Sequence, residues 1–508
     1  MRLSTVLEDM PGAEVIRDAE ITGIAYDSRA VSPGYAFFAI PGLKDDGRRY
    51  IPQALSRGAS AVVTNLGGDF PVTGGLGVPE EAGLAVVRDP RRALSSAAAV
   101  YYGYPSRSLT AVGITGTKGK TTTCHLVRSV LEACGLKTGL IGTVHNIVGD
   151  EERPVTRTTP ESLELQSLLS EMVAKGCDAV AMEVSSHALE LFRVEDILFD
   201  AAVFTNMGWD HLDFHDTMEA YAGAKARLFG LLEKSRGLKK KEFPLVAAIN
   251  GDDAYAPLFR EKATGRVVTY GLGETHEVRA EDIRMDPRGT TFTLVCGETR
   301  RTVRTVLVGR FNVYNSLAAA AVAYGFGFDL EDIARGLETA KSVRGRVELV
   351  PGDRFSVWVD YAHTPESLRD ILALAREMST GKVIAVFGCG GDRDAGRRPV
   401  MGKLAGDMAD FVIITNDNPR TEDPDKILDD IESGLKESSG GSSYLRIKDR
   451  RAAINEAIGR AGPGDVVVLA GKGHETYQII GREVHHFDDA EEARKAISAV
   501  SGKEGERR

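Results

Sequence analysis

The segment GITGTKGKTT, from Gly113 to Thr122, constrains the fold more than any other part of the chain. It follows the apolar run LTAVGIT, which predicts a buried strand, and opens a helical pattern over about 119–134. A glycine-rich loop between a strand and a helix presents backbone N–H groups to phosphate oxygens. Lys120 would contact the β- and γ-phosphates, and the Thr121 hydroxyl would bind Mg²⁺. The usual pattern has glycine where Ile114 stands, so this is a variant loop; the alternative is a glycine-rich turn without a ligand.

Strands and helices alternate on both sides of this loop, which is typical of a parallel, doubly wound sheet. The first 105 residues mix short strand-like runs with a helix near 89–102, and a new βα series begins near 343. A length of 508 residues also indicates about three domains. We therefore predict an α/β protein with an N-terminal α/β domain over 1–107, a central P-loop ATPase-like parallel sheet domain over 108–342 and a C-terminal Rossmann-like domain over 343–508.

Composition narrows the possible partners and compartment. The net charge of -10 lacks the basic footprint of a protein that binds nucleic acid. Five scattered cysteines without a CxxC pair indicate neither a disulfide framework nor a zinc site, and they fit a reducing cytoplasm. The N-terminus lacks the apolar stretch of a signal peptide, and the most apolar segment, Leu317 to Phe328, is too short to span a bilayer. We expect a cytoplasmic monomer that binds no nucleic acid and does not insert into membranes.

Acidic and imidazole groups follow the next strands of the central domain. Glu183 lies in MEVSSH, and Asp210 and His211 lie in NMGWDHLDFH. Such groups are often ordinary hydrogen-bonded polar residues, but their position after a phosphate loop in the same sheet favours a metal site. Lys225, in YAGAKARLF, would by default be a surface lysine, and the basic run over 234–243 a solvated helix end and loop.

Charged turns follow the strands of the third domain. Arg393, Asp417, Arg420 and Glu475 all lie in such turns, where open parallel sheets bind ligands. Guanidinium groups bind carboxylates and carboxylates bind ammonium groups, so the set suits an amino-acid substrate. The alternative is an Asx-type turn at Asp417 with arginines in surface ion pairs.

Nine motifs in order, GITGTKGKTTT, MEVSSHAL, TNMGWDHLDFH, YAGAKARLF, GRFNVYN, VDYAHTP, GCGGDRDAGRRP, DNPR and AGKGHE, resemble those of the Mur ligases of peptidoglycan synthesis. The resemblance implies three domains that bind a UDP-sugar, ATP and an amino acid. It also implies that ATP phosphorylates a carboxylate of a UDP-N-acetylmuramoyl-L-alanyl-D-glutamate and that an amine attacks the acyl phosphate. In this family DNPR marks members that select meso-diaminopimelate rather than L-lysine.

The resemblance also implies a role for each matching residue. It assigns ATP to Gly116, Thr117, Lys118, Gly119, Lys120, Thr121 and Thr122, and to Asn312, Arg346 and Asp360. It assigns the UDP-linked substrate to Ser28, Thr158, Thr159, Ser185 and Arg193, and diaminopimelate to Arg393, Asp417, Asn418, Pro419, Arg420, Gly471 and Glu475. Catalytic roles fall to Lys120, Glu183, His211 and Lys225, and Mg²⁺ to Thr121, Glu183, His211 and Lys225, the last being the lysine that family members carbamylate (N6-carboxylysine).

The chain departs from the family pattern at some UDP-substrate positions. Arg157 and Leu191 stand where some members have Asn and Gln, and Leu43-Lys44-Asp45 replaces a His-Gln pair. Rival functions are a sister ligase that adds L-lysine or another amino acid, a folylpolyglutamate-type synthetase, and a nucleotide-dependent switch. DNPR and Arg393 argue against the first two, and a switch needs no amino-acid pocket.

Overall fold

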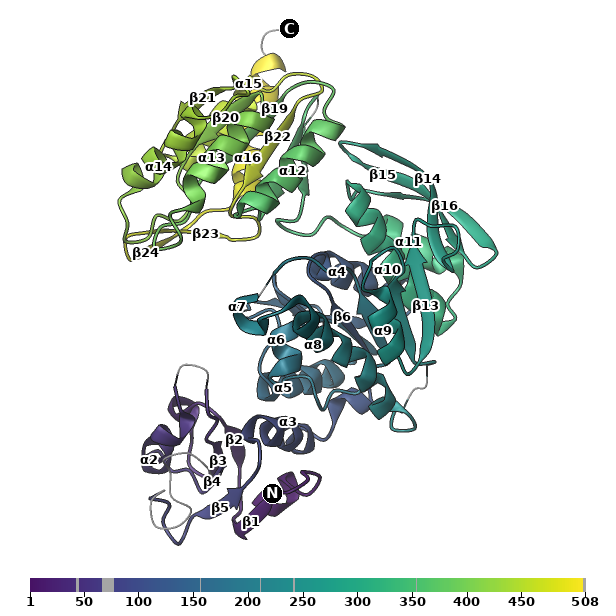
Figure 1. Cartoon of the computed structure of the whole chain (residues 1–508), viewed down its shortest axis with the longest axis vertical. Coiled ribbons are helices and arrows are strands. Elements are labelled where there is room, and N and C mark those ends of the chain that lie inside the picture. Colours follow the sequence, from purple (N-terminus) through teal and green to yellow (C-terminus); the bar gives the residue numbers. More distant parts are fainter. Residues whose placement is uncertain are drawn as a thin grey trace. The chain divides into compact units, whose positions relative to one another are not determined.

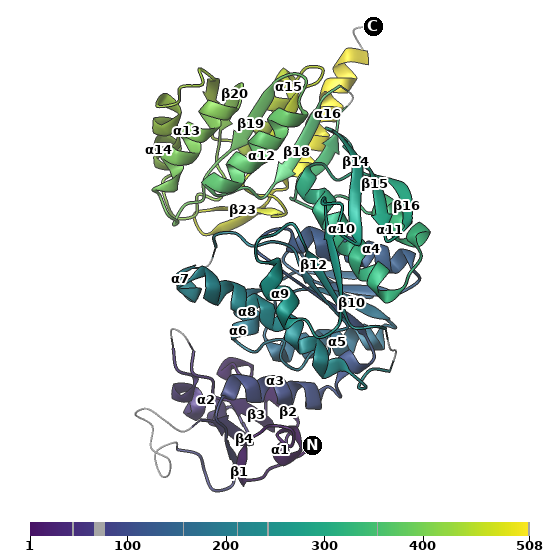
Figure 2. The ribbon, with the colours of Figure 1, turned by 45° about the vertical axis from the view of Figure 1, so that its right-hand side comes forward.

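The computed structural model describes residues 1–42, 45–65, 77–155, 157–210, 212–240, 243–352 and 354–505. The chain forms two compact units (Figures 1 and 2). Unit 1 comprises Met1–Arg279, Val295–Arg300 and Tyr314–Gly336, and unit 2 comprises Ala280–Leu294, Arg301–Val313 and the chain from Leu337 onward. The division into 1–107, 108–342 and 343–508 stays a prediction. No helix in the described part of the chain is long and apolar enough to cross a membrane.

The N-terminal part of unit 1 is a five-stranded sheet in the order β1-β5-β4-β3-β2 (purple in Figure 1). Its elements are α1 (Leu3–Val6), β1 (Glu14–Arg17), β2 (Gly23–Ala25), β3 (Tyr35–Phe38), α2 (Ile51–Ser56), β4 (Ala61–Thr64), β5 (Gly83–Val86) and α3 (Pro90–Tyr101). Neighbouring strands from β2 to β5 are parallel, and β1 is antiparallel to β5. Asp89 caps α3 by accepting a hydrogen bond from the Arg91 N–H. The helix expected near 89–102 is therefore confirmed.

The central part of unit 1 is built on strands in the order β13-β12-β11-β6-β10-β7-β8-β9. These strands are β6 (Thr110–Thr115), β7 (Thr138–Ile141), β8 (Asn146–Val148), β9 (Glu151–Arg153), β10 (Ala179–Glu183), β11 (Ala201–Phe204), β12 (Val246–Asn250) and β13 (Arg266–Gly271). The accompanying helices are α4 (Lys120–Ala133), α5 (Ser162–Ala174), α6 (Ser186–Glu190), α7 (Leu212–His215), α8 (Met218–Leu231) and α9 (Ala256–Lys262). All six residues of β6 are buried, as expected of a parallel strand with both faces covered.

The parallel sheet predicted for the central segment is confirmed from β13 to β7. β8 and β9 are antiparallel strands at its edge, which was not predicted because their runs of three residues are too short to show a period. Further elements contain residues of both units: β14 (Val278–Asp286), β15 (Gly289–Cys296), β16 (Thr299–Thr305), α10 (Arg310–Phe326) and α11 (Leu330–Thr339).

Unit 2 contains a six-stranded sheet in the order β17-β18-β22-β19-β20-β21, which is parallel except for β17. Its strands are β17 (Glu348–Pro351), β18 (Ser356–Asp360), β19 (Val383–Phe387), β20 (Phe411–Ile414), β21 (Ser443–Arg446) and β22 (Val466–Ala470), and a separate hairpin is formed by β23 (Tyr477–Ile480) and β24 (Glu483–His486). The helices are α12 (Pro365–Met378), α13 (Arg397–Met408), α14 (Pro424–Lys436), α15 (Arg450–Arg460) and α16 (Asp489–Gly505).

Alternating strand residues build the two cores of unit 2. Trp358 and Val468 pack with α12, α13 and α14, whereas Val357 and Val467 pack with α15 and α16. Helices therefore cover both faces of the sheet (Figure 1), and the central strand β22 is apolar and buried at every position. The Rossmann-like architecture expected of this segment is confirmed.

The basic run over 234–243 was expected to be solvated, and the burial of Lys239 shows that this expectation is wrong for that residue. Its side chain is 4% exposed, and its ammonium lies 2.6 Å from Asp200 Oδ2. The ammonium also donates hydrogen bonds to the carbonyls of Ser106 and Leu109. Asp200 Oδ2 also accepts the Ala111 N–H. A lysine that the local sequence places on the surface is thus the buried counterion of the carboxylate before β11.

Candidate nucleotide and amino-acid sites

The loop between β6 and α4 has a backbone that two glycines make possible. Gly116 has φ +145° and Gly119 has φ +85°, both in the left-handed range that favours glycine. A Cβ on Gly116 would lie 1.9 Å from Thr205 Oγ1, and one on Gly119 would lie 2.5 Å from Asn315 Oδ1. The loop therefore has neither the conformational nor the steric freedom for larger residues at these two positions.

Residues that follow β11 hold this loop in place. The Thr117 N–H donates to the Asn206 carbonyl at 2.8 Å, and the Lys118 N–H donates to Asn206 Oδ1 at 3.0 Å. Thr205 Oγ1 donates to the Lys118 carbonyl at 2.7 Å. Thr205 and Asn206 were not predicted as site residues. Their position at the end of the strand next to β6 was the available signal.

Two lysine ammonium groups meet at one loop carbonyl. Lys120 Nζ donates to Gly116 O at 2.9 Å, and Lys225 Nζ, from α8, donates to the same oxygen at 2.7 Å. Lys225 is 1% exposed and its ammonium lies 4.3 Å from the centre of the Tyr221 ring. Burial, and then the charge of Lys120, hold the pKa of Lys225 well below its usual range. Lys225 is therefore not the surface lysine that its local sequence indicates.

Glu183 ends β10 as a buried carboxylate beside the start of α4. It accepts hydrogen bonds from Thr121 Oγ1 at 3.1 Å, from the Thr143 N–H at 2.7 Å and from Thr143 Oγ1 at 3.1 Å. The structure thus brings together Thr121 and Glu183, two of the four predicted Mg²⁺ ligands, and hydroxyl and carboxylate oxygens suit that ion. His211, the third, lies outside the described residues. Groups of three or more His, Cys, Asp or Glu able to hold a metal do not occur in the described part.

Residues predicted to bind the UDP-linked substrate lie beside Glu183. Thr159 Oγ1 donates to the Glu183 carbonyl at 2.9 Å and accepts the Ser185 N–H at 3.2 Å. Arg193 donates to the Thr159 carbonyl at 3.1 Å and pairs with Glu161 at 2.8 Å. Thr158 also belongs here, because its hydroxyl accepts a hydrogen bond from Thr143. Four of the five predicted UDP-substrate residues, Thr158, Thr159, Ser185 and Arg193, thus belong to one hydrogen-bonded polar cluster, in which Thr159 is buried.

Ser28, the fifth, lies in the N-terminal sheet region. Its hydroxyl donates to Gln53 Oε1 at 2.7 Å, and its neighbour Asp27 caps the short 3₁₀ turn that contains it. Arg157, at a position where the chain departs from the family pattern, pairs with Glu161 at 2.6 Å. Glu161 therefore pairs with three arginines, Arg157, Arg193 and, at 3.7 Å, Arg91.

Three residues predicted to contact the nucleotide, Asn312, Arg346 and Asp360, belong to unit 2, whereas the phosphate loop belongs to unit 1. Asp360 ends β18, where it accepts the Val347 N–H at 2.8 Å and burial raises the pKa of its carboxyl. The Arg346 guanidinium lies 5.3 Å from the Tyr361 ring centre. Their assignment to ATP stays a prediction.

A cavity of about 390 Å³ opens at the carboxyl ends of β18, β19, β20 and β22, all within unit 2. Six of the seven residues predicted to bind diaminopimelate line it: Arg393, Asp417, Asn418, Arg420, Gly471 and Glu475. The seventh, Pro419, instead turns its carbonyl toward Gly391, where an added Cβ would lie 1.9 Å from it. Seven further lining residues were not predicted as site residues: Tyr361, His363, Gly388, Cys389, Gly390, Arg397 and Tyr477.

The cavity presents charges of both signs. Three guanidinium groups, from Arg393, Arg397 and Arg420, share it with the carboxylates of Asp417 and Glu475. Arg420 has a left-handed backbone with φ +53°, and its side chain donates to the Gly391 carbonyl at 2.9 Å. A cavity lined by both kinds of charge can bind a molecule that carries both carboxylates and ammonium groups.

Three family models match the chain: "Mur ligase family, catalytic domain" over residues 20–102, "Mur ligase middle domain" over 114–323 and "Mur ligase, glutamate ligase domain" over 345–473. The UDP-N-acetylmuramoyl-L-alanyl-D-glutamate--2,6-diaminopimelate ligase of Geobacillus thermodenitrificans (strain NG80-2) is 45% identical over 500 residues, which cover 98% of this chain and 99% of that protein. A solved structure of a ligase with the same name is 35% identical, with a TM-score of 0.68 and coverage of 94% and 95%. The MurF ligase of Thermotoga maritima, solved with ADP, is 20% identical over 95% of this chain and 98% of its own, and its TM-score of 0.58 shows a shared fold alone.

Proposed function

Because the chain belongs to the Mur ligase family, we propose that it is an ATP-dependent ligase that joins meso-diaminopimelate to UDP-N-acetylmuramoyl-L-alanyl-D-glutamate. The reaction would serve the synthesis of peptidoglycan precursors in the cytoplasm. The observation that carries the proposal is the mixed-charge cavity at the strand ends of unit 2, in a chain whose unit 1 contains a phosphate loop.

In the first step, the free carboxylate of the D-glutamate residue attacks the γ-phosphorus of ATP, which forms an acyl phosphate and releases ADP. A carboxylate is a poor acyl donor, and phosphorylation supplies a good leaving group. The loop over 116–122 would bind the phosphates through its backbone N–H groups, and Lys120 would neutralise charge on the transferred phosphoryl group. The polar cluster of Thr158, Thr159, Ser185 and Arg193 would bind the UDP-linked dipeptide through its accessible members.

Mg²⁺ fits the oxygen atoms that Thr121 and Glu183 bring together at 3.1 Å, and when bound it would neutralise phosphate charge. His211 and a carbamylated Lys225 would complete the ligands. Support for the modification comes from the burial and lowered pKa of Lys225, because only a neutral amine reacts with CO₂.

In the second step, an amine of diaminopimelate attacks the acyl carbon, forms the amide and expels phosphate. The cavity of unit 2 would bind this substrate, its carboxylates at Arg393 and Arg420 and an ammonium group at Asp417 and Glu475. The amine must be neutral when it attacks, whereas a second amino group keeps its charge.

The test is phosphate release by the purified protein with ATP, Mg²⁺ and the UDP-muramoyl dipeptide. Three parallel reactions contain meso-diaminopimelate, L-lysine or no amino acid, and mass spectrometry identifies the product. We expect release and a tripeptide product with diaminopimelate alone. A preference for L-lysine would overturn the substrate while keeping the ligase, and hydrolysis without any amino acid or product would indicate a nucleotide-dependent switch instead.

A further inference from the structure

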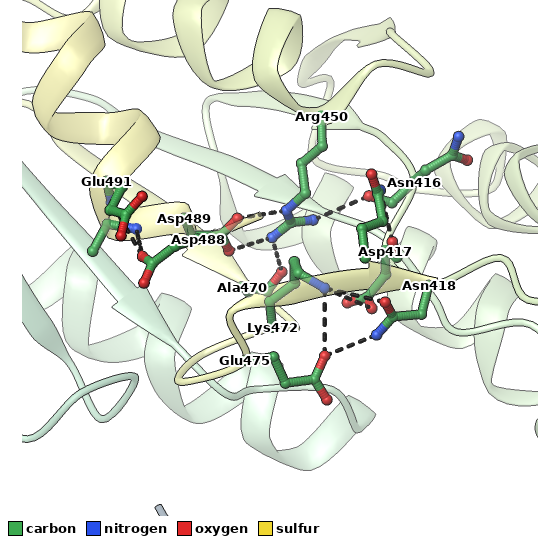
Figure 3. A network of polar contacts seen from close by, with 12 residues as sticks. Asn416, Asp417, Asn418, Arg450, Ala470, Lys472, Glu475, Asp488, Asp489 and Glu491 are labelled. Atoms are coloured by element: carbon green, nitrogen blue, oxygen red, sulfur yellow. Dashed lines mark hydrogen bonds and ion pairs between the residues drawn. The ribbon is translucent and has the colours of Figure 1, made fainter. Parts of the chain in front are cut away.

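Lys472 lies behind residues that line the amino-acid cavity and has no role in the proposed function. It follows Gly471 at the end of β22, and its side chain is 0% exposed. Its ammonium lies 3.3 Å from Asn418 Oδ1, 3.4 Å from Glu475 Oε2 and 4.0 Å from Asp417 Oδ1 (Figure 3). Each of these three oxygen atoms belongs to a residue that lines the cavity.

Lys472 and the backbone N–H of Ile479 together fix how the Asn418 amide is oriented. An ammonium group only donates hydrogen bonds, so the atom of Asn418 that faces it must be the oxygen. The same oxygen accepts the Ile479 N–H at 2.9 Å. The amide nitrogen then points the other way and donates to Glu475 Oε2 at 2.8 Å.

Glu475 is therefore held by one of its two carboxylate oxygens. Figure 3 shows the contacts from Asn418 and Lys472 converging on Oε2. Buried contacts with an ammonium group restrict the rotation of a carboxylate far more than contacts with solvent do. The second oxygen of Glu475 is left for a cation in the cavity.

The substrate class supplies that cation. A diamino acid reacts through one neutral amine, and its other amino group stays an ammonium ion that must be desolvated inside the cavity. Three arginines in the cavity repel this ion, and Asp417 and Glu475 attract it. The position of the two carboxylates thus decides whether a second amino group is accepted.

We propose that Lys472 is a positioning residue that selects diamino acids by fixing Glu475, directly and through Asn418, so that the carboxylate faces the non-reacting ammonium group of the substrate. The inference rests on the proposed function. It goes further because it assigns the recognition of the substrate's second amino group in part to Lys472, a residue that does not contact the substrate.

The test compares two substrates that differ only in that amino group, meso-diaminopimelate and L-2-aminopimelate. We expect Lys472→Met to lower the ratio of kcat/KM for diaminopimelate to kcat/KM for aminopimelate by about 10- to 100-fold, the effect of losing a charged hydrogen bond. Aminopimelate kinetics and the KM for ATP should change by less than about 3-fold. Lys472→Gln, which keeps a donor without the charge, should give an intermediate ratio.

Lys403→Met is the matched control, because Lys403 is a half-exposed lysine of the same unit that contacts Asp407 and the Glu437 carbonyl on the surface. The ratio of kcat/KM for diaminopimelate to kcat/KM for aminopimelate in this variant should equal that of the unsubstituted enzyme. Equal losses for the two substrates in Lys472→Met would overturn the proposal, as would loss of all folded protein in both Lys472 variants, since each outcome makes Lys472 a purely structural residue. Failure of the proposed function would look different, because the unsubstituted enzyme would then make no product with either amino acid.

Discussion

Replacing Lys239 with methionine tests how much a buried ion pair contributes to unit 1. Lys239 Nζ lies 2.6 Å from Asp200 Oδ2, and the side chains are 4% and 1% exposed. Methionine fills similar volume but leaves the carboxylate of Asp200 without its counterion and removes two hydrogen bonds to carbonyls. Breaking a buried pair at one side costs about 3–5 kcal/mol of the free energy of unfolding. In a unit of about 300 residues that corresponds to a fall in Tm of about 5–8 °C.

The pH dependence of this loss has a predictable sign. Burial raises the pKa of Asp200 and lowers the pKa of Lys239. A carboxyl whose pKa is higher in the folded than in the unfolded protein favours folding when it is protonated. The deficit of Lys239→Met should therefore shrink as the pH falls toward the raised pKa of Asp200. Asp200→Asn leaves an ammonium group with a lowered pKa instead, so its deficit should shrink as the pH rises.

Differential scanning calorimetry of the two single variants and the double variant at pH 5.5, 7 and 8.5 measures these effects. The double variant should lose less stability than the sum of the single variants, because it buries no unpaired charge. The Asp200→Asn side chain still offers an oxygen to the Ala111 N–H. Strictly additive losses, or losses that do not depend on pH in either single variant, would refute the reasoning.

Three further predictions concern the two sites. Gly116→Ala should abolish phosphate release and leave the far-UV circular dichroism unchanged, because its Cβ would lie 1.9 Å from Thr205 Oγ1; retained activity would remove this loop from the nucleotide site. Arg420→Ala should raise the KM for diaminopimelate about 10- to 100-fold and change the KM for ATP by less than about 3-fold, and equal changes in both constants would contradict its assignment. Lys225→Ala should be inactive, and added formate or acetate should partly restore its activity. ¹³C NMR of the unsubstituted enzyme in ¹³CO₂ should show a carbamate signal. An inactive variant without rescue, together with a spectrum without that signal, would rule the modification out.

The sequence predicts the parts of the site that are encoded locally. The strand β6, the glycines 116 and 119 and the start of α4 are adjacent in the chain, and each has a residue preference of its own. The polar turns after β18, β19, β20 and β22 were predicted to form a site for a similar reason, because parallel strands end at one edge of the sheet. Six of the seven predicted residues duly line one cavity.

What the sequence does not reveal are contacts between distant segments. Asn206 holds the phosphate loop through its side chain and backbone, and nothing in its local pattern separates it from an ordinary turn residue. Lys239 lies in a strongly basic run, so composition places it in solvent, yet one tertiary partner, Asp200, buries it. Tyr477 lines the cavity because the β23 hairpin, which is separate from the six-stranded sheet, lies beside it.

For the carbamylation that we propose for Lys225, the charge of a neighbouring group matters as much as burial. Lys120 and Lys225 donate to the same carbonyl, and the charge of Lys120 helps to hold the pKa of Lys225 low. A positive neighbour therefore favours the neutral amine, which is the form that reacts with CO₂. The product of that reaction is an anion, and the same positive neighbour stabilises it. Lys120 thus favours both the reactant and the product of carbamylation, whereas burial alone would favour the neutral amine and oppose the carbamate.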